Sequence, residues 1–176
     1  MVRVAPAENN LPYREASRIN IHRDTWGTNL YQQINWWAPV SNVEEKNTMI
    51  FYPDYFDVPV KNTTSTWDLN IYLANRKKGD FSYPSAPQLK EDLPSNIKKI
   101  PVTIKPGEIL CFSGAHLHSS SKEKSENTRI SFEIRTICEN DLNSSAQAPN
   151  VDCDLQWKFP KIFKKINDNS PLKITS

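Results

Sequence analysis

The sequence lacks any long apolar run, any basic stripe and any signal-peptide pattern. No apolar stretch approaches the roughly 18 residues that a membrane-spanning helix needs. The 22 basic residues are nearly balanced by 20 acidic ones, and no stripe of basic residues interleaved with aromatic residues runs along the chain. The N-terminal segment MVRVAPAENNLPYREAS has no apolar middle of the signal-peptide kind. We therefore expect neither a membrane nor a nucleic acid among the partners.

Cysteine and glycine are also scarce. The three cysteines are an odd number at wide spacing, which predicts neither a disulfide framework nor a zinc knuckle and is typical of the reducing cytoplasm. One of them, Cys111, stands inside the apolar run ILCF and is expected to pack in the core. With 176 residues, the chain is long enough for one domain with a sizeable core. We expect a single cytoplasmic domain over residues 1–176.

What the sequence does contain is a series of short segments rich in β-branched and aromatic residues, which predict strands. The predicted strands are Leu30–Val40, Thr48–Pro53, Val102–Ile104, Glu108–Phe112 and Thr128–Thr136. One helix is expected to start near Leu69, with Ser65 or Thr66 as its N-cap, and to stop at Gly79. Several short strands with few helices predict an all-β fold with minor α, either a sandwich or a jelly roll.

The histidines lie in two places, each at the end of a predicted strand or beside an acidic residue. His22 and Asp24 are two positions apart, so an extended strand would point both side chains to the same face. His116 and His118 are also two positions apart, so a strand would point both to the same face, and this pattern does not show which of them is a ligand. Two histidines and one carboxylate form the ligand set of non-heme iron(II) oxygenases, and the absence of thiolate ligands argues against a closed zinc site. A lone surface or core histidine is the commoner interpretation of each residue taken singly.

An arginine follows the second pair of histidines. Arg129 lies 11 positions after His118, on the polar face of the alternating segment Thr128–Thr136. A guanidinium binds a carboxylate through two parallel hydrogen bonds, which suits a dicarboxylate ligand, although a solvated charge is the usual fate of an arginine. Its face of the strand carries Arg129, Ser131, Glu133 and Arg135. This row is too polar for a dry core and is suited to line a cavity.

Two amides and a tryptophan share one face of the predicted strand Leu30–Val40. Gln33, Asn35 and Trp37 alternate with the opposite set, so only one of Trp36 and Trp37 can point inward. Buried amides need hydrogen-bond partners. We therefore treat this face as a candidate for contact with a cofactor or a substrate.

Several segments together resemble the iron(II)- and 2-oxoglutarate-dependent oxygenases, on the side of the phytanoyl-CoA dioxygenase-like branch. These segments are HRDTW, QINWWAPV, FYPDYF, PGEILCFSGAHLHSSS and TRISFEIRT. The resemblance covers residues 19–136 in the family order of His-x-Asp, a distal histidine and then an arginine, and leaves 160–176 as a C-terminal extension. It implies a double-stranded β-helix, the jelly-roll barrel that cupins also use.

The resemblance also implies a site. Iron(II) would be held by His22, Asp24 and one later histidine, and 2-oxoglutarate would place its distal carboxylate on Arg129. In this branch a serine two residues after the distal histidine meets the same carboxylate, and Ser120 stands there if His118 is the ligand. Related halogenases lack the carboxylate that Asp24 supplies, so its presence favours hydroxylation over halogenation.

The choice between the two later histidines follows from the same branch. Its spacing from distal histidine to arginine favours His118 as the third ligand and leaves His116 as the alternative, or as a residue beside the ligands or the substrate. Typical members have a much longer N-terminal region than the stretch before His22. We therefore expect an open pocket, which a homo-oligomer could cover.

The implied function is a dioxygenase that uses iron(II), 2-oxoglutarate and O2 to hydroxylate a small-molecule substrate. Two alternatives stay open. One is a cupin-like metal-dependent isomerase or epimerase, against which Arg129 and Ser120 argue. The other is a catalytically silent module that binds the metal or 2-oxoglutarate, against which the complete set of candidate ligands argues.

Overall fold

The computed structural model describes residues 2–7, 19–121, 125–142 and 144–173, so the last three residues of the predicted C-terminal extension lie outside the described residues. Within the described residues, strands form two antiparallel sheets and the helices are few and short. This agrees with the predicted all-β class with minor α. The described strands do not close into a barrel, and the jelly roll stays a prediction.

Sheet A has four strands and carries one wall of the site. In spatial order it contains β1 (Val2–Ala5), β7 (Arg129–Thr136), β2 (Ile34–Pro39) and β5 (Leu110–Ser113). β7 pairs with both β1 and β2, with Val4 opposite Ile130 and Trp36 opposite Ile134. The predicted strand Thr128–Thr136 is therefore confirmed as the centre of the sheet, between the N-terminal strand and β2.

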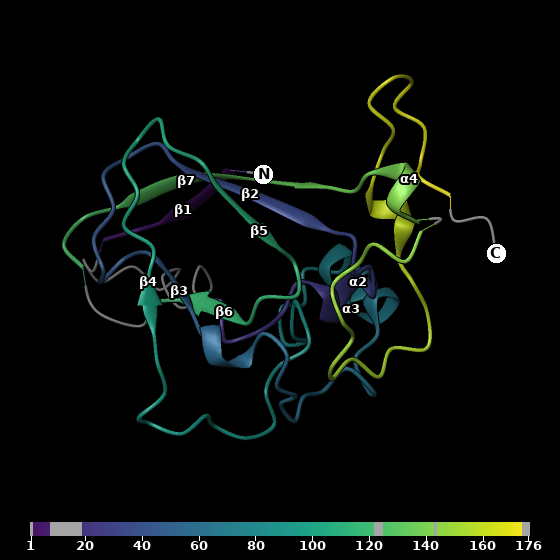
Figure 1. Ribbon diagram of the computed structural model, residues 1–176, viewed down its shortest axis with the longest axis horizontal. Coiled ribbons are helices and arrows are strands. Elements are labelled where there is room, and N and C mark those ends of the chain that lie inside the picture. The colour runs from purple at the N-terminus through teal and green to yellow at the C-terminus, as the bar shows by residue number, and fades with distance from the viewer. Residues whose placement is uncertain (1, 8–18, 122–124, 143, 174–176) are drawn as a thin grey trace.

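Sheet B has three strands and lies beneath sheet A in Figure 1. It contains β4 (Ile100–Pro101), β3 (Met49–Phe51) and β6 (His118–Ser120) in that order. Residues 19–22 run beside β6: His22 N donates to His118 O at 2.9 Å, and His118 N donates to His22 O at 3.0 Å. The two segments that carry histidines in the sequence are thus neighbours in space.

The predicted strand Val102–Ile104 is wrong. The extended pairing lies just before it, at β4, where Ile50 of β3 is opposite Pro101. Val102 N still donates to Met49 O at 2.9 Å, but β3 begins at Met49, so the following residues have no strand to pair with. The Val102 side chain instead packs between the sheets with Trp37, Met49 and Phe112.

The helices are α2 (Thr25–Thr28), α3 (Leu69–Lys77) and α4 (Glu139–Leu142), with 3-10 turns η1 (Pro53–Tyr55) and η2 (Pro160–Ile162). The predicted helix is confirmed as α3, but its N-cap is Asp68 and neither Ser65 nor Thr66. The Asp68 carboxylate accepts hydrogen bonds from the backbone of Asn70 and Ile71, which satisfies two free N–H groups of the first turn. None of the described helices is long and apolar enough to cross a membrane.

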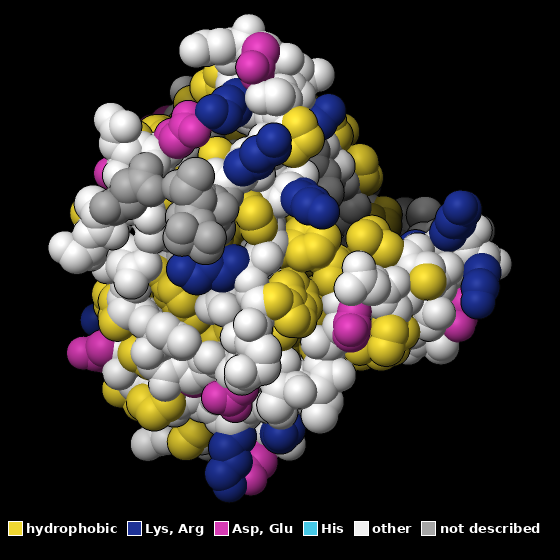
Figure 2. All heavy atoms as spheres, turned by 90° about the vertical axis from the view of Figure 1, so that its right-hand side faces the viewer, with side chains coloured by type: hydrophobic (Ala, Val, Ile, Leu, Met, Phe, Trp, Pro, Cys, Tyr) yellow, Lys and Arg dark blue, Asp and Glu magenta, His cyan; other side chains and the backbone are white. Residues whose placement is uncertain are grey.

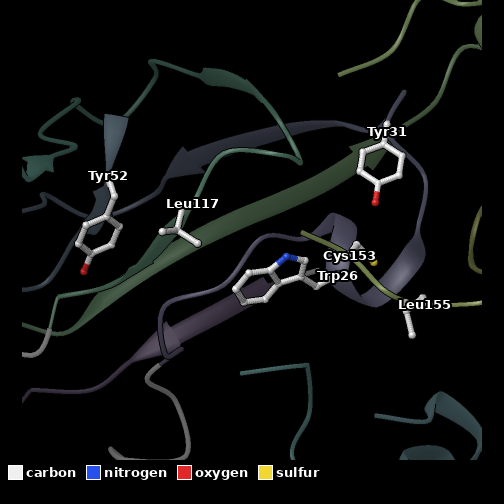
Figure 3. Packing of buried hydrophobic residues seen from close by; sticks show 6 residues of the cluster. All are labelled: Trp26, Tyr31, Tyr52, Leu117, Cys153 and Leu155. Carbon is white, nitrogen blue, oxygen red and sulfur yellow. The ribbon is translucent and has the colours of Figure 1, made fainter. Parts of the chain in front are cut away.

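A hydrophobic cluster anchors the segment that carries His22 and Asp24. Figure 3 shows its six buried members: Trp26, Tyr31, Tyr52, Leu117, Cys153 and Leu155. Trp26 follows Asp24 by two residues and is fully buried, and its indole N–H donates to Asp152 at 2.7 Å. Residues 152–155 of the C-terminal part therefore fix the position of the chain next to the candidate ligands.

Candidate metal centre

His22, Asp24 and His118 lie together in the interior. Within the described part of the chain, they form the one group of histidine, cysteine and acidic side chains close enough to share a metal ion, and their ligand atoms lie within 4.8 Å of one another. All three are buried. His116, the predicted alternative, does not belong to this group.

The backbone that brings His22 and Asp24 together differs from the predicted strand. His22 pairs with His118, but Asp24 has helical dihedral angles, φ −65° and ψ −29°, and stands at the N-cap position of α2. The expectation that alternation along one strand would align the two side chains is therefore wrong. The turn into α2 brings them together instead, with His22 Nε2 3.5 Å from Asp24 Oδ1.

Backbone carbonyl groups orient both imidazole rings. His22 Nδ1 donates to Asn20 O at 2.8 Å, and His118 Nδ1 donates to His116 O at 2.9 Å. A carbonyl oxygen can only accept, so Nδ1 carries the hydrogen and a neutral ring leaves its Nε2 lone pair free. His118 Nε2 lies 3.7 Å from Asp24 Oδ2, so two imidazole lone pairs and one carboxylate converge. This donor set fits a divalent metal such as iron(II).

The charge state of the cluster suits metal binding. Burial, together with the nearby His22, lowers the pKa of His118 to about 4, so the ring is neutral at physiological pH. Burial alone would raise the pKa of Asp24, but Arg135 and the two histidines outweigh it and hold that pKa well below its ordinary value. Neutral imidazoles and an ionised carboxylate are the forms that bind metals.

Asn35 and Arg135 hold the Asp24 carboxylate from two sides. Asn35 Nδ2 donates to Asp24 Oδ2, and Arg135 Nη2 donates to Asp24 Oδ1 at 2.8 Å. Arg135 also binds Glu133 on the same strand, at 2.8 Å. The sequence indicated that Arg135 belongs to the polar row of β7 but did not connect it with Asp24. The sequence feature that could have pointed to Arg135 is its position on the same face of the strand as Arg129.

The predicted face of Gln33, Asn35 and Trp37 divides into two parts. Gln33 Nε2 donates to Asn35 Oδ1 at 2.8 Å, and Gln33 Oε1 accepts from Thr28 Oγ1 at 3.2 Å, so the partners of this amide are protein groups behind Asn35. A Cβ at Gly114 would lie 3.0 Å from Gln33 Nε2, which shows how closely the chain packs there. Gln33 and Asn35 are not among the residues that line the neighbouring cavity, whereas Trp37 is.

A cavity connects the cluster to the predicted 2-oxoglutarate residues. Its lining residues are Arg3, Ile19, His22, Trp37, Met49, His118, Ser119, Ser120, Arg129 and Glu133. Arg129, Ser120 and Trp37 therefore face the same space as both histidines of the cluster. The Ser120 hydroxyl accepts from Ile19 N at 3.2 Å and keeps its own proton available for donation.

Arg129 is the unusual group in this cavity. It is buried, its guanidinium carbon lies 5.6 Å from the centre of the Trp37 ring, and its Nε has no hydrogen-bond partner among the residues that the structure describes. Burial lowers its pKa to about 10, so the group is still a cation. A buried cation with an unused donor is costly unless a ligand satisfies it. A carboxylate ligand such as that of 2-oxoglutarate fits this requirement.

His116 lies outside the cluster, in the turn that leads from β5 to β6. Its ring packs on Phe56 at 4.6 Å and on Phe51 at 5.6 Å between ring centres, and burial lowers its pKa. Its backbone carbonyl holds the His118 ring. Its contribution to the cluster is therefore made through the main chain.

The comparisons with known proteins concern the fold. No protein-family model matches the sequence, and no curated protein matches it. Among solved structures, EvdO2 from Micromonospora carbonacea var. aurantiaca has a TM-score of 0.52 at 10% identity, over 88% of this chain and 53% of that chain. The apo form of ThoJ, a non-heme monooxygenase, has a TM-score of 0.50 at 14% identity, over 78% of this chain and 44% of that chain.

A structure of EvdO2 complexed with 2-oxoglutarate gives a TM-score of 0.47 at 10% identity, over 78% of this chain and 51% of that chain. The chain thus spans about half the length of these solved proteins. At these identities the likeness concerns the fold alone, which is similar to that of EvdO2 and ThoJ, and the family stays unassigned by sequence.

Proposed function

We propose that the protein is an iron(II)- and 2-oxoglutarate-dependent oxygenase of the phytanoyl-CoA dioxygenase-like kind, which hydroxylates a small-molecule substrate. The observation that carries the proposal is the joint lining of one cavity by two imidazoles of a His-Asp-His cluster and by a buried guanidinium with an unused donor. The fold shared with ThoJ supports it, as does the 2-oxoglutarate that EvdO2 binds in one of its crystal structures.

His22, Asp24 and His118 would hold the metal. An iron(II) ion there, with 2-oxoglutarate and O2, would supply the oxidation of a substrate C–H bond to an alcohol, coupled to the conversion of 2-oxoglutarate into succinate and CO2. The protein's own contribution is to fix the three ligands. Backbone carbonyls set the tautomer of each imidazole, and Asn35 and Arg135 set the direction of the Asp24 carboxylate.

Arg129 and Ser120 would bind the distal carboxylate of 2-oxoglutarate. The Arg129 donors and the Ser120 hydroxyl face the same cavity, and Trp37 and Met49 supply apolar walls that exclude water from this end. An ion pair in such a desolvated site is stronger than one in water, which favours a ligand with two carboxylates over one with a single carboxylate.

The proposal is tested by titrating iron(II) and then 2-oxoglutarate into the protein under anaerobic conditions. We expect His22→Ala, Asp24→Ala and His118→Ala each to lose metal binding, while His116→Ala, the matched control, retains it. Metal binding that survives His118→Ala and is lost in His116→Ala would show that the third ligand is misassigned.

The same titration, followed by an assay for succinate in air, separates the alternative functions. A protein that binds the metal but not 2-oxoglutarate would fit a metal-dependent isomerase or epimerase. A protein that binds both but forms no succinate in air with any substrate would fit a silent binding module. Succinate formation that depends on His118 and Arg129 is the result expected of the oxygenase.

A further inference from the structure

The two faces of β7 have the opposite polarity to that of a strand in an ordinary surface sheet. The inner face carries Arg129, Ser131 and Glu133, which turn toward sheet B and the cavity. A sheet with one face in the interior normally places its apolar residues there and its polar residues outside. In this protein, the alternation along β7 therefore leaves the apolar row on the outer face.

The outer face is exposed and continuous. Six of its residues, which we call the outer apolar face, are Val2, Val4, Trp36, Ile130, Phe132 and Ile134, and each is between 37% and 59% exposed. They are neighbours across three strands, because Val2 is opposite Phe132, Val4 is opposite Ile130 and Trp36 is opposite Ile134. Cys111 of β5, opposite Trp36, extends the row and is exposed, so its predicted packing in the core is wrong.

The outer apolar face carries no charge. The outward-pointing positions of β1, β7, β2 and β5 are filled by apolar, cysteine, serine or threonine residues. The side of the molecule in Figure 2 is different, because there apolar side chains lie among lysine and arginine side chains. An uncharged apolar sheet face is the surface on which two identical chains can meet without like-charge repulsion.

We propose that the outer apolar face is an interface between two copies of this chain, packed sheet against sheet. The six side chains expose on the order of 500 Å² of apolar surface, near the upper limit for a patch on a monomer. Two such faces would bury roughly 1,000 Å² in total, which reaches the lower limit of a specific interface. Packing two twisted sheets face to face is a standard arrangement of β proteins.

The proposed interface lies on the opposite side of sheet A from the cavity. The second copy would therefore leave the site open, in contrast to the homo-oligomer expected to cover it. The interface does not depend on the proposed oxygenase function, since it rests on β1, β2 and β7 side chains that point away from the metal cluster.

The test is the mass of the protein in solution as a function of concentration, measured by sedimentation equilibrium. We expect the wild type to approach twice the 20.2 kDa chain mass and Phe132→Lys to stay at 20.2 kDa. The matched control is Leu73→Lys, which places the same charge at a half-exposed apolar position on α3 and should leave the wild-type mass unchanged. A wild type at 20.2 kDa throughout, or a Phe132→Lys variant that is still a dimer, would overturn the proposal.

A second measurement uses the wild-type chain alone, in case Phe132→Lys does not fold. Cys111 lies next to the outer apolar face, and Cys138 is exposed beyond the end of β7. Maleimide labelling of Cys111 should slow several-fold relative to Cys138 as the protein concentration rises. Equal labelling rates for the two thiols at every concentration would contradict the interface.

Discussion

At the residue scale, Asp24 has the most demanding environment in the site. It is buried against two imidazoles, an amide and a guanidinium, and its negative charge depends on Arg135 as the nearest cation. A metal ion would supply a second positive charge to the same carboxylate. Arg135 therefore stabilises the Asp24 charge in the metal-free protein, and Arg135 and the metal stabilise it together in the metal-bound protein.

This leads to a prediction for Arg135→Gln. The metal-free variant should lose about 1–3 kcal/mol of folding free energy, because a buried carboxylate loses one of its charged hydrogen-bond donors. Saturating metal should raise the folding free energy of the variant by more than it raises that of the wild type. Thermal unfolding with and without metal measures both effects. The control is Arg3→Gln, because the Arg3 side chain pairs with Glu133 and not with Asp24. Equal metal-induced shifts in the two variants would contradict the role of Arg135.

His118 predicts how the stability of the metal-free protein depends on pH. Its pKa is about 4 in the folded chain and near 6.5 in the unfolded chain, so between these values only the unfolded chain takes up the proton. Stability should therefore fall by roughly 3 kcal/mol as pH drops from 6.5 to 4. Asp24 adds little to this slope above about pH 5, because its lowered pKa affects stability only where the unfolded carboxyl begins to take up a proton. Urea unfolding across this range should show the slope reduced in His118→Asn and largely kept in His116→Asn.

Arg129 is expected to determine the affinity for 2-oxoglutarate. Arg129→Gln removes the cation and its paired donors from the cavity, so the dissociation constant should rise by a factor on the order of 100 while metal affinity is kept. Calorimetric titration of 2-oxoglutarate into the metal-loaded protein measures this change. Arg3→Gln, which also lines the cavity, is the comparison. A larger loss in Arg3→Gln would move the carboxylate site toward β1.

The sequence predicted the candidate ligands better than the residues that support them. His22, Asp24 and Arg129 were candidates by residue type and order, and His118 was chosen over His116 from the spacing in the family that the sequence resembles. The structure brings His22, Asp24, His118 and Arg129 to one cluster and its cavity. The contact of Arg135 with Asp24 depends on where β7 lies relative to α2, which no local pattern encodes. Which of two equivalent polar positions on a strand meets a given carboxylate is decided by tertiary packing.

At the scale of elements, Arg23 lies between the candidate ligands His22 and Asp24 and joins their segment to three other parts of the chain. Its guanidinium donates to the backbone carbonyls of Tyr55, Val58 and Ala115 at 2.6–2.9 Å. It also pairs with Asp152 at 3.1 Å. Because both side chains are almost fully shielded from solvent, the cation holds η1, the turn before β6 and the C-terminal segment around one point.

Arg23→Met should therefore destabilise the fold far more than a surface substitution. Removing one partner of a buried pair typically costs about 3–5 kcal/mol, since the other charge and the carbonyl groups lose their partner. The urea midpoint measures the loss. Lys61→Met is the matched control, because the Lys61–Glu91 pair at 2.7 Å is exposed and should change stability by less than about 1 kcal/mol. Similar losses in both variants would show that Arg23 does not join these segments.

The elements also show what alternation along a strand can and cannot predict. The alternating pattern of β7 correctly predicted two faces of unlike polarity, and Arg129 and Glu133 of the polar row line the cavity, whereas Ser131 and Arg135 do not. The pattern did not reveal that the apolar row would be exposed, because periodicity identifies the faces and not their surroundings. The location of Cys111 was wrong for the same reason.

At the scale of the whole molecule, the metal and 2-oxoglutarate should act as one stabilising unit. A ligand at about a hundred times its dissociation constant adds about 2.7 kcal/mol to the folded state, and each kcal/mol raises the melting temperature of a chain of this size by about 2–4 °C. We expect a shift of roughly 5–10 °C with both ligands and almost none with 2-oxoglutarate alone. Differential scanning calorimetry measures it. A full shift with 2-oxoglutarate in the absence of metal would contradict a cosubstrate that binds through the metal.

The pairing of β1 with β7, and of Asp24 with Arg135, joins the beginning of the chain to its later part. A ribosome adds roughly 5–20 residues per second, so roughly 5–20 s separate the synthesis of Asp24 from that of Arg135. During this interval the nascent chain has His22 and Asp24 but lacks the strand that completes their site. Metal capture must therefore follow, and cannot guide, the synthesis of most of the chain.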